Sequence, residues 1–183
     1  MSYRRELVQI AVPILVVVAL YVGFALYMGN WSPFMVVMSG SMVPTLKIGW
    51  IIVVKSIAPA GIRVGNIIVY RSTDPMIKDP IVHRVISISD INGTLYFLTK
   101  GDANFENDAQ AGFEPPQGIP QSRVVGKVVY IVPYLGYLVL FLKQPPVYAL
   151  LVALLIVLIV ADLLGDMTHK DESEANAVPV QHT

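Results

Sequence analysis

The longest uncharged stretch of the chain constrains its fold most. No Asp, Glu, Lys or Arg lies between Glu6 and Lys47, and the first part of this stretch, Leu7 to Met28, is apolar almost throughout. As a helix these 22 residues would be about 33 Å long, enough to cross the roughly 30 Å hydrocarbon core of a bilayer. Pro13 lies near the start of the run, where a membrane helix tolerates it. The apolar core of a cleavable signal peptide is shorter, about 7 to 15 residues, so we predict a permanent anchor over residues 7–28.

A second apolar run, Val147 to Leu164, follows the break Lys143-Gln144-Pro145-Pro146. Its length predicts a second membrane-spanning helix, and the alternative is a helix that lies at the membrane surface or packs on the protein. Residues 165–183 are polar and contain no Phe, Trp or Tyr. Such a composition is typical of a disordered tail.

The basic residues nearest the anchor predict its orientation. Arg4 and Arg5 precede the first apolar run, and positive charge beside a membrane helix favours the cytoplasmic side. We therefore expect residues 1–6 in the cytoplasm, residues 30–146 outside it as one domain, and residues 165–183 inside again.

The charge and the cysteine count exclude several classes of function. The chain has 13 basic and 13 acidic residues, a net charge of zero, and no basic patch that would bind nucleic acid. It has no cysteine, which excludes disulfides and thiolate metal ligands. We expect no metal and no cofactor.

Between the two apolar runs the pattern changes to short segments rich in Val, Ile, Tyr and Phe, typical of strands. Asn92-Gly93, between two of these segments, is a strong signal for a two-residue hairpin turn. We predict a compact, mainly antiparallel β domain in which Ala103 to Gln121 forms one long loop. The expected strands are Gly49–Ile57, Asn66–Ser72, Ile81–Asp90, Thr94–Gly101 and Arg123–Val132.

One set of residues in this domain could perform nucleophilic catalysis, which needs a hydroxyl, a base to take its proton, and a group to orient the base. Ser41 lies in the loop "VVMSGSMVPTLKIGW", and His83 is the one histidine between the apolar runs. Asp102 and Asp108 are both candidates for the third role. Each also has a plainer interpretation, because Ser41 and Asp102 fit turns, Asp108 fits a solvated loop, and a lone strand histidine is often structural.

Four sequence blocks carry a family resemblance. "SGSMVPT", "IVHRV", "KGDANFENDAQ" and "VVGKVVYIVPYLGY" follow an N-terminal apolar helix in that order. Together they resemble the type I signal peptidases, in the archaeal and endoplasmic-reticulum branch, from Val36 to about Tyr137. The first three blocks are specific in combination.

The resemblance implies a role for each matching residue. Ser41 matches the nucleophile, and His83 stands where the bacterial branch has a lysine base. Asp108 matches the residue that orients the histidine, whereas Asp102 matches a second aspartate that we expect to support the geometry of the site. Ser39 falls where the bacterial branch contributes a donor to the oxyanion hole. The third block departs from the commoner family pattern at Ala103 and Asn107.

Local chemistry adds two expectations about the turn itself. Gly40 would let the backbone bend sharply beside Ser41. Met42 and the apolar flank Phe34–Met38 would lie against substrate and lipid.

The function implied is that of a membrane-bound serine endopeptidase, signal peptidase I, which removes signal peptides from exported preproteins by cutting after small residues. The expected partners are these signal peptides, the lipid bilayer and the secretion translocon. We expect an archaeal-type plasma membrane rather than the endoplasmic reticulum. Two alternatives remain: a noncatalytic anchored β scaffold, and a Ser-Lys peptidase with Lys100 or Lys78 as its base. The sequence leaves open whether the protein acts alone or in a complex.

Overall fold

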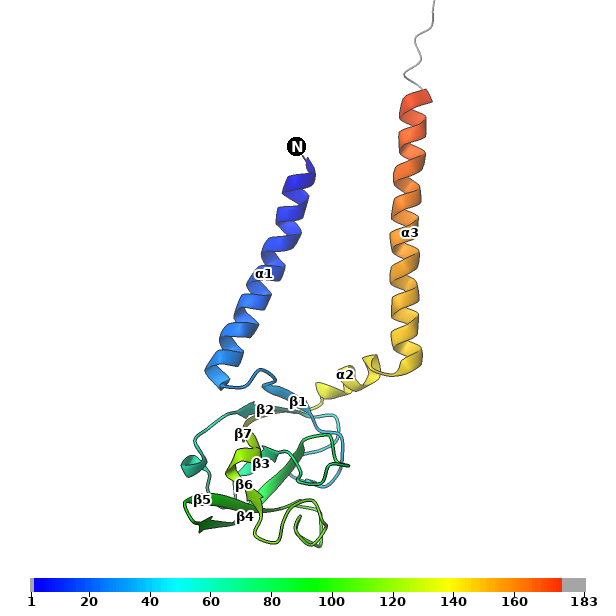
Figure 1. Cartoon of the computed structure of the whole chain (residues 1–183). Helices are drawn as coiled ribbons and strands as arrows, with labels where there is room; N and C mark the ends of the chain where they lie inside the picture. Colours follow the sequence, from blue (N-terminus) through cyan, green and yellow to red (C-terminus); the bar gives the residue numbers. More distant parts are fainter. Residues whose placement is uncertain (1, 176–183) are drawn as a thin grey trace, which may run out of the picture. The chain divides into compact units, whose positions relative to one another are not determined.

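The computed structural model describes residues 2–175. The chain divides after Tyr137 into two compact units. The first unit begins with helix α1, Ser2–Met28, and continues into seven strands (Figure 1). These are β1 (Phe34–Val36), β2 (Ile51–Lys55), β3 (Ile67–Tyr70), β4 (Ile81–Ile91), β5 (Thr94–Lys100), β6 (Ile119–Pro120) and β7 (Val124–Val132). Two short 3₁₀ helices, η1 (Pro59–Gly61) and η2 (Gln121–Arg123), interrupt the loops.

All seven strands belong to one curled sheet in the order β1-β2-β7-β3-β4-β5-β6, and every neighbouring pair is antiparallel (Figure 1). The five strands expected from the sequence are present, and the mainly β, antiparallel class is confirmed. The hairpin at Asn92-Gly93 joins β4 to β5, with φ of 53° and 79°, the left-handed conformation that this pair of residues favours. The two shortest strands, β1 and β6, were not expected, because two or three residues carry too little pattern to identify.

The sheet encloses two clusters of buried apolar side chains. One joins Met42 and Leu46, which follow Ser41, to residues of β2 and β3. The other lies around Phe97 of β5 and Tyr70 of β3. Because Met42 and Leu46 are in the first cluster, the core itself holds the turn that carries Ser41.

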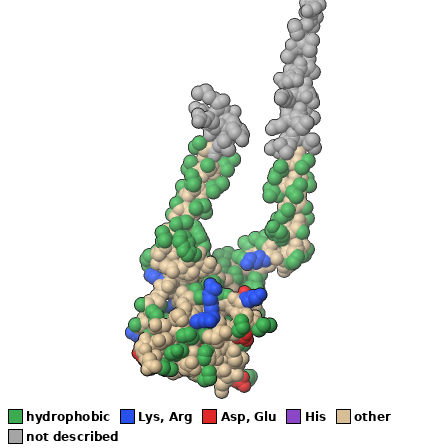
Figure 2. Space-filling model, viewed as in Figure 1, with side chains coloured by type: hydrophobic (Ala, Val, Ile, Leu, Met, Phe, Trp, Pro, Cys, Tyr) green, Lys and Arg blue, Asp and Glu red, His purple; other side chains and the backbone are tan. Residues whose placement is uncertain are grey.

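Helix α1 contains a stretch, Val8–Met28, with a mean hydropathy of 2.5, which is long and apolar enough to cross a membrane. Apolar side chains cover its described length (Figure 2). Its end contacts the sheet domain: Phe24 stacks on Phe34 with 5.1 Å between ring centroids, and Lys55 Nζ lies 4.3 Å from the centre of the Tyr27 ring. The anchor therefore continues directly into the first strand of the domain.

The second unit consists of the rest of helix α2, Gly136–Leu142, and helix α3, Pro145–Ala175. The axes of Gly136–Leu142 and Pro145–Ala161 differ by 72°, so the second expected span is a candidate only if this bent pair crosses as one broken span. The helix α2 was not expected from the sequence.

Helix α3 differs from the expected boundaries at both ends. It begins at Pro145, because proline is favoured in the first turn of a helix. It continues past Leu164 to Ala175, where the sequence predicted disorder. Adding residues to an existing helix needs no new nucleus, so a polar segment can extend an apolar helix. The remainder of the predicted disordered tail, 176–183, lies outside the described residues.

Candidate active site

Ser41 lies in a tight turn between the half-buried Gly40 and the buried Met42. The Val43 N–H donates to the Gly40 carbonyl at 3.1 Å, and the Leu46 N–H donates to the Met42 carbonyl at 2.9 Å. Met42 is only 1% exposed, so the expectation that it faces substrate and lipid is wrong. Its side chain packs in the core. This packing anchors the turn and leaves Ser41 half-buried at the surface.

The glycine that the turn requires is Gly101 rather than Gly40. A Cβ built on Gly40 would meet only Val43 Cγ2, at 3.8 Å, which is an ordinary contact. A Cβ on Gly101 would lie 2.6 Å from the Ser41 carbonyl oxygen, closer than atoms can approach. Two residues further along the chain, the Ala103 N–H donates to the Ser41 carbonyl oxygen at 2.8 Å. The segment Gly101–Ala103 thus packs against the backbone of Ser41 and donates a hydrogen bond to it.

His83 lies on β4, opposite Ile68 of β3, and is 3% exposed. Its Nε2 is 3.0 Å from Ser41 Oγ, and its Nδ1 is 2.6 Å from Asp108 Oδ2. An ionised carboxylate can only accept, so Nδ1 carries the hydrogen and Nε2 is left to accept the Ser41 hydroxyl proton. The structure brings together Ser41, His83 and Asp108, which lie far apart in the sequence.

Asp108 is fully buried and concentrates its hydrogen bonds on one oxygen. Besides His83, the Tyr70 hydroxyl donates to Oδ2 at 2.7 Å and the Thr99 hydroxyl donates to it at 2.5 Å. Burial alone would raise the pKa of Asp108, but the hydrogen bond and charge of His83, with the two hydroxyl donors, hold it below its ordinary value. Asp108 is therefore a carboxylate at neutral pH.

Within the described residues Asp102 makes no hydrogen bond to Ser41 or His83. It accepts two hydrogen bonds from Arg84, at 2.8 Å from Nε and 2.7 Å from Nη2, and one from the Thr45 hydroxyl at 2.5 Å. The hydrogen bond from Arg84 is the largest influence on the pKa of Asp102 and lowers it, against the opposing effect of burial. Asp102 thereby ties the Ser41 turn, through Thr45, to the strand that carries His83.

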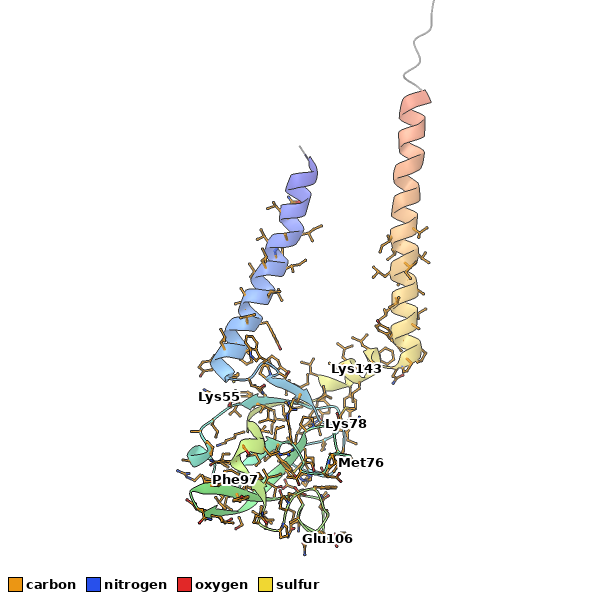
Figure 3. All side chains as sticks on the ribbon, viewed as in Figure 1. Lys55, Met76, Lys78, Phe97, Glu106 and Lys143 are labelled. Carbon is orange, nitrogen blue, oxygen red and sulfur yellow. The ribbon has the colours of Figure 1, made fainter. Side chains whose placement is uncertain are left out.

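Ser39 is exposed, and its Oγ lies 3.3 Å from Ser41 Oγ. Within the described residues, His83 and Ser39 are the two hydrogen-bond partners of the Ser41 hydroxyl. The alternative base Lys78, labelled in Figure 3, is exposed and does not hydrogen-bond to Ser41. When Ser41 attacks a carbonyl group, the carbonyl oxygen becomes an oxyanion beside Ser41. The hydroxyl of Ser39 is close enough to donate a hydrogen bond to this oxyanion.

Five residues that shape the site were not identified from the sequence: Thr45, Tyr70, Arg84, Thr99 and Glu114. Arg84 and Thr45 lie inside the blocks that carry the resemblance, so their position could have drawn attention to them. Tyr70 and Thr99 sit in apolar strand segments, where their hydroxyls give no signal of a shared partner. Glu114 lies in the long loop, where a charged residue is ordinarily solvated.

The arrangement has the parts required for nucleophilic attack on a carbonyl: a half-buried hydroxyl, an imidazole beside it, and a buried carboxylate behind the imidazole. In the described part of the chain no three His, Cys, Asp or Glu side chains are grouped so that they could hold a metal ion. The geometry therefore fits acyl transfer through a serine.

Residues 4–89 match a family model described as signal peptidase, peptidase S26. The chain is 36% identical over 132 residues to the signal peptidase complex catalytic subunit SEC11C of Homo sapiens and of Canis lupus familiaris, over 70% of this chain and 68% of each relative. It is 31% identical over 125 residues to the signal peptidase complex catalytic subunit SEC11 of Fusarium vanettenii, over 68% of this chain and 72% of that relative. The family model includes Ser41 and His83 and ends before Asp108.

Proposed function

Because this chain belongs to the signal peptidase family, peptidase S26, and is thereby a membrane-anchored serine endopeptidase, we propose that Ser41, His83 and Asp108 are its catalytic triad. The observation that carries the proposal is the pair of short contacts made by His83, 3.0 Å to Ser41 Oγ and 2.6 Å to Asp108 Oδ2. Neither alternative is favoured: the relatives are named catalytic subunits, and the side chain beside Ser41 is a histidine, not a lysine.

The reaction proceeds in two halves. The Ser41 oxygen attacks the carbonyl carbon of the scissile peptide while His83 Nε2 takes the hydroxyl proton. When the tetrahedral intermediate collapses, the protonated ring gives this proton to the leaving amine, and the signal peptide stays bound to Ser41 as an ester. Water then attacks the ester with His83 again as base, and Ser41 recovers its proton as the signal peptide leaves.

Three sets of groups assist without bonding to the carbonyl carbon of the substrate. Asp108 keeps the His83 ring oriented and stabilises its charge when it is protonated. The hydroxyl of Ser39 and the backbone N–H of Ser41 donate to the developing oxyanion. Asp102, with Arg84 and Thr45, holds the turn of Ser41 against β4.

The substrate is the apolar helix of a signal peptide, followed by an extended segment with small residues before the cut. Residues 29–40 are all that separate the end of α1 from Ser41, so Ser41 lies near the bilayer surface, where such a cleavage site emerges from the membrane. Residues 30–146 form the extracytoplasmic domain of this arrangement. The bilayer and the secretion translocon, which delivers the preprotein, are its partners.

The relatives revise the expected location. They are animal and fungal proteins named as subunits of a signal peptidase complex, and they lend no support to an archaeal-type plasma membrane. We therefore propose the endoplasmic-reticulum membrane and assembly with further subunits. Expression of the tagged full chain in a yeast cell and fractionation of its membranes would test this, since a plasma-membrane signal would contradict it.

The direct test of the triad is cleavage of a model preprotein by the detergent-solubilised full chain, followed as a size shift on a gel. Wild type is expected to cut after a small residue at the signal-peptide junction. Ser41→Ala is expected to lose at least about 10³-fold in rate, because no other group can form the ester. Ser32→Ala, a matched change in the segment after α1, should cleave like wild type. Cleavage by Ser41→Ala at the wild-type rate would exclude Ser41 as the nucleophile.

A further inference from the structure

A second buried carboxyl lies behind the triad. Glu114 is 4% exposed, although it belongs to a loop rather than to a strand. Its Oε1 accepts from the Thr99 N–H at 3.0 Å, and its Oε2 lies 3.0 Å from Thr99 Oγ1. Neither contact is with a positive charge. Thr99 is the residue whose hydroxyl also reaches Asp108.

The hydrogens available for the contacts among Glu114, Thr99 and Asp108 can be counted. Thr99 has one hydroxyl hydrogen, and its oxygen is 2.5 Å from Asp108 Oδ2 and 3.0 Å from Glu114 Oε2. A single hydrogen cannot be donated to both carboxyls. The shorter contact, to the ionised Asp108, takes it. The contact with Glu114 is then a hydrogen bond only if Glu114 itself carries a proton on Oε2 and donates it to the Thr99 oxygen.

We propose that Glu114 is a positioning residue for the triad: its neutral carboxyl donates to Thr99 Oγ1 and so commits the one Thr99 hydroxyl hydrogen to Asp108, which orients His83. This inference rests on the proposed triad. It assigns to the long loop between β5 and β6 the task of holding Asp108 in place from behind. The chain of contacts runs Glu114, Thr99, Asp108, His83, Ser41.

The surroundings of Glu114 favour the neutral form. Burial is the largest influence on the pKa of Glu114 and raises it, the two bonds with Thr99 oppose this, and the charge of Asp108 adds to it. Together they bring the pKa from the ordinary value of 4.5 to about 7. Tyr70 is a further titratable group near it, and burial raises the pKa of that phenol well above its ordinary value, so Tyr70 remains a neutral donor. Arg123, on η2, is bonded to the Ser72 carbonyl and has no part in lowering the pKa of Glu114.

Loss of the Glu114 proton would reverse the arrangement. A second negative charge would appear beside Asp108, and the Thr99 hydroxyl would then face two carboxylates that compete for its hydrogen. Asp108 would then lose the hydrogen bond from the Thr99 hydroxyl, or its side chain would shift. The protonated form of Glu114 is therefore the one that supports the triad, and activity should decline as pH rises through about 7.

Two variants separate this role from a merely structural one. Glu114→Gln keeps the geometry and supplies an N–H donor to Thr99 Oγ1 at every pH, whereas Glu114→Met keeps the volume and supplies no donor. Glu106→Gln is the matched control, since Glu106 lies exposed in the same loop (Figure 3). The measurement is the pH profile of kcat and KM for a model preprotein, with the full chain in detergent.

We expect wild type and Glu106→Gln to show a kcat that falls as pH rises through about 7. Glu114→Gln should lack this alkaline decline, and Glu114→Met should lose about tenfold in kcat with KM changed less than about twofold. An alkaline decline in Glu114→Gln equal to that of wild type would overturn the proposal. So would an undiminished kcat in Glu114→Met. If Glu114→Met does not fold, the pH profile of Glu114→Gln decides alone.

A second readout does not depend on cleavage. A neutral buried carboxyl gives its own infrared carbonyl band, which should be present in Ser41→Ala, vanish as pH rises through about 7, and be absent in Glu114→Gln. Absence of this band in Ser41→Ala would overturn the Glu114 proposal even if the triad assignment holds. Presence of the band in a wild-type protein that does not cleave would support a neutral Glu114 and count against the triad assignment instead.

Discussion

Asp108 shows how one buried oxygen can organise the candidate catalytic site. Oδ2 accepts from His83, Tyr70 and Thr99, while the other oxygen, Oδ1, has no partner within the described residues. Because all three donors meet at one atom, the His83 ring is held in a single orientation with Nε2 toward Ser41. The cost of burying the charge is offset by these donors, so the carboxylate persists in the folded protein.

Replacing Asp108 by asparagine tests this arrangement. An amide can donate to His83 Nδ1, which would place the ring hydrogen on Nε2 and leave no acceptor for the Ser41 proton. We expect kcat to fall by about 10³ to 10⁴, with little change in KM because Asp108 does not touch the substrate. The measurement is steady-state cleavage of a model preprotein.

Asp79→Asn is the control for this change, since Asp79 is exposed and makes no hydrogen bond within the described residues. It should cleave like wild type. A loss of less than about tenfold in Asp108→Asn would argue that another group orients His83.

At the scale of elements, the loop that follows β5 holds the site together. Its first residues, Gly101–Ala103, support the Ser41 carbonyl, and its middle supplies Asp108 and Glu114. The Asp108 N–H donates to the Thr99 carbonyl at 2.9 Å, which fixes the loop to the end of β5. Hydrogen bonds therefore tie this long loop to the end of β5 at several points around the site.

The close approach of Gly101 to Ser41 gives a prediction at this scale. In Gly101→Ala the new Cβ would lie 2.6 Å from the Ser41 carbonyl oxygen, a backbone atom that must move. We expect a loss of about 1 to 3 kcal/mol in unfolding free energy, and cleavage reduced at least about tenfold because Ser41 shifts relative to His83. Thermal unfolding and the rate of preprotein cleavage measure the two effects.

Gly61→Ala is the matched control, because the new Cβ would meet only Ile57 Cδ1, at 3.7 Å. It should match wild type in both measurements. Wild-type activity in Gly101→Ala would mean that Ser41 does not depend on this contact.

Across the whole molecule, the buried carboxyls make stability depend on pH in opposite directions. The pKa values of Asp102 and Asp108 are lowered by folding, so their contribution is present above their ordinary value of 3.8 and is lost as pH falls below it. The pKa of Glu114 is raised by folding, so its contribution is complete below 4.5 and is lost as pH rises through about 7.

This opposition predicts that wild type loses stability between pH 4.5 and about 7, by at most about 3 kcal/mol. Glu114→Gln should not show this loss, since it has no proton to release, and both proteins should be destabilised by acid below about pH 4. The measurement is thermal unfolding of the full chain in detergent, followed by tryptophan fluorescence across this pH range. Parallel curves for the two proteins from pH 4.5 to 7 would contradict a raised pKa for Glu114.

The sequence by itself determined the apolar anchor, the five longer strands, the Asn92-Gly93 hairpin and the identity of Ser41, His83, Asp102, Asp108 and Ser39 as candidates. These follow from composition, from local backbone preferences and from short residue blocks, all of which act over a few neighbouring positions. The same local reasoning mistook Met42 for a surface residue and Gly40 for the glycine that the turn requires. Both properties depend on packing against residues that are remote in the sequence.

Only the tertiary structure decided which groups meet. The pairing of β3 with β4 and the fold of the loop after β5 bring Tyr70, Thr99 and Glu114 to Asp108, and Arg84 and Thr45 to Asp102. Hydrogen bonds and burial depend on distances between residues remote in the chain, and sequence spacing carries no information about those distances. For the same reason the ionisation of Glu114 follows from the folded surroundings and not from the residue type.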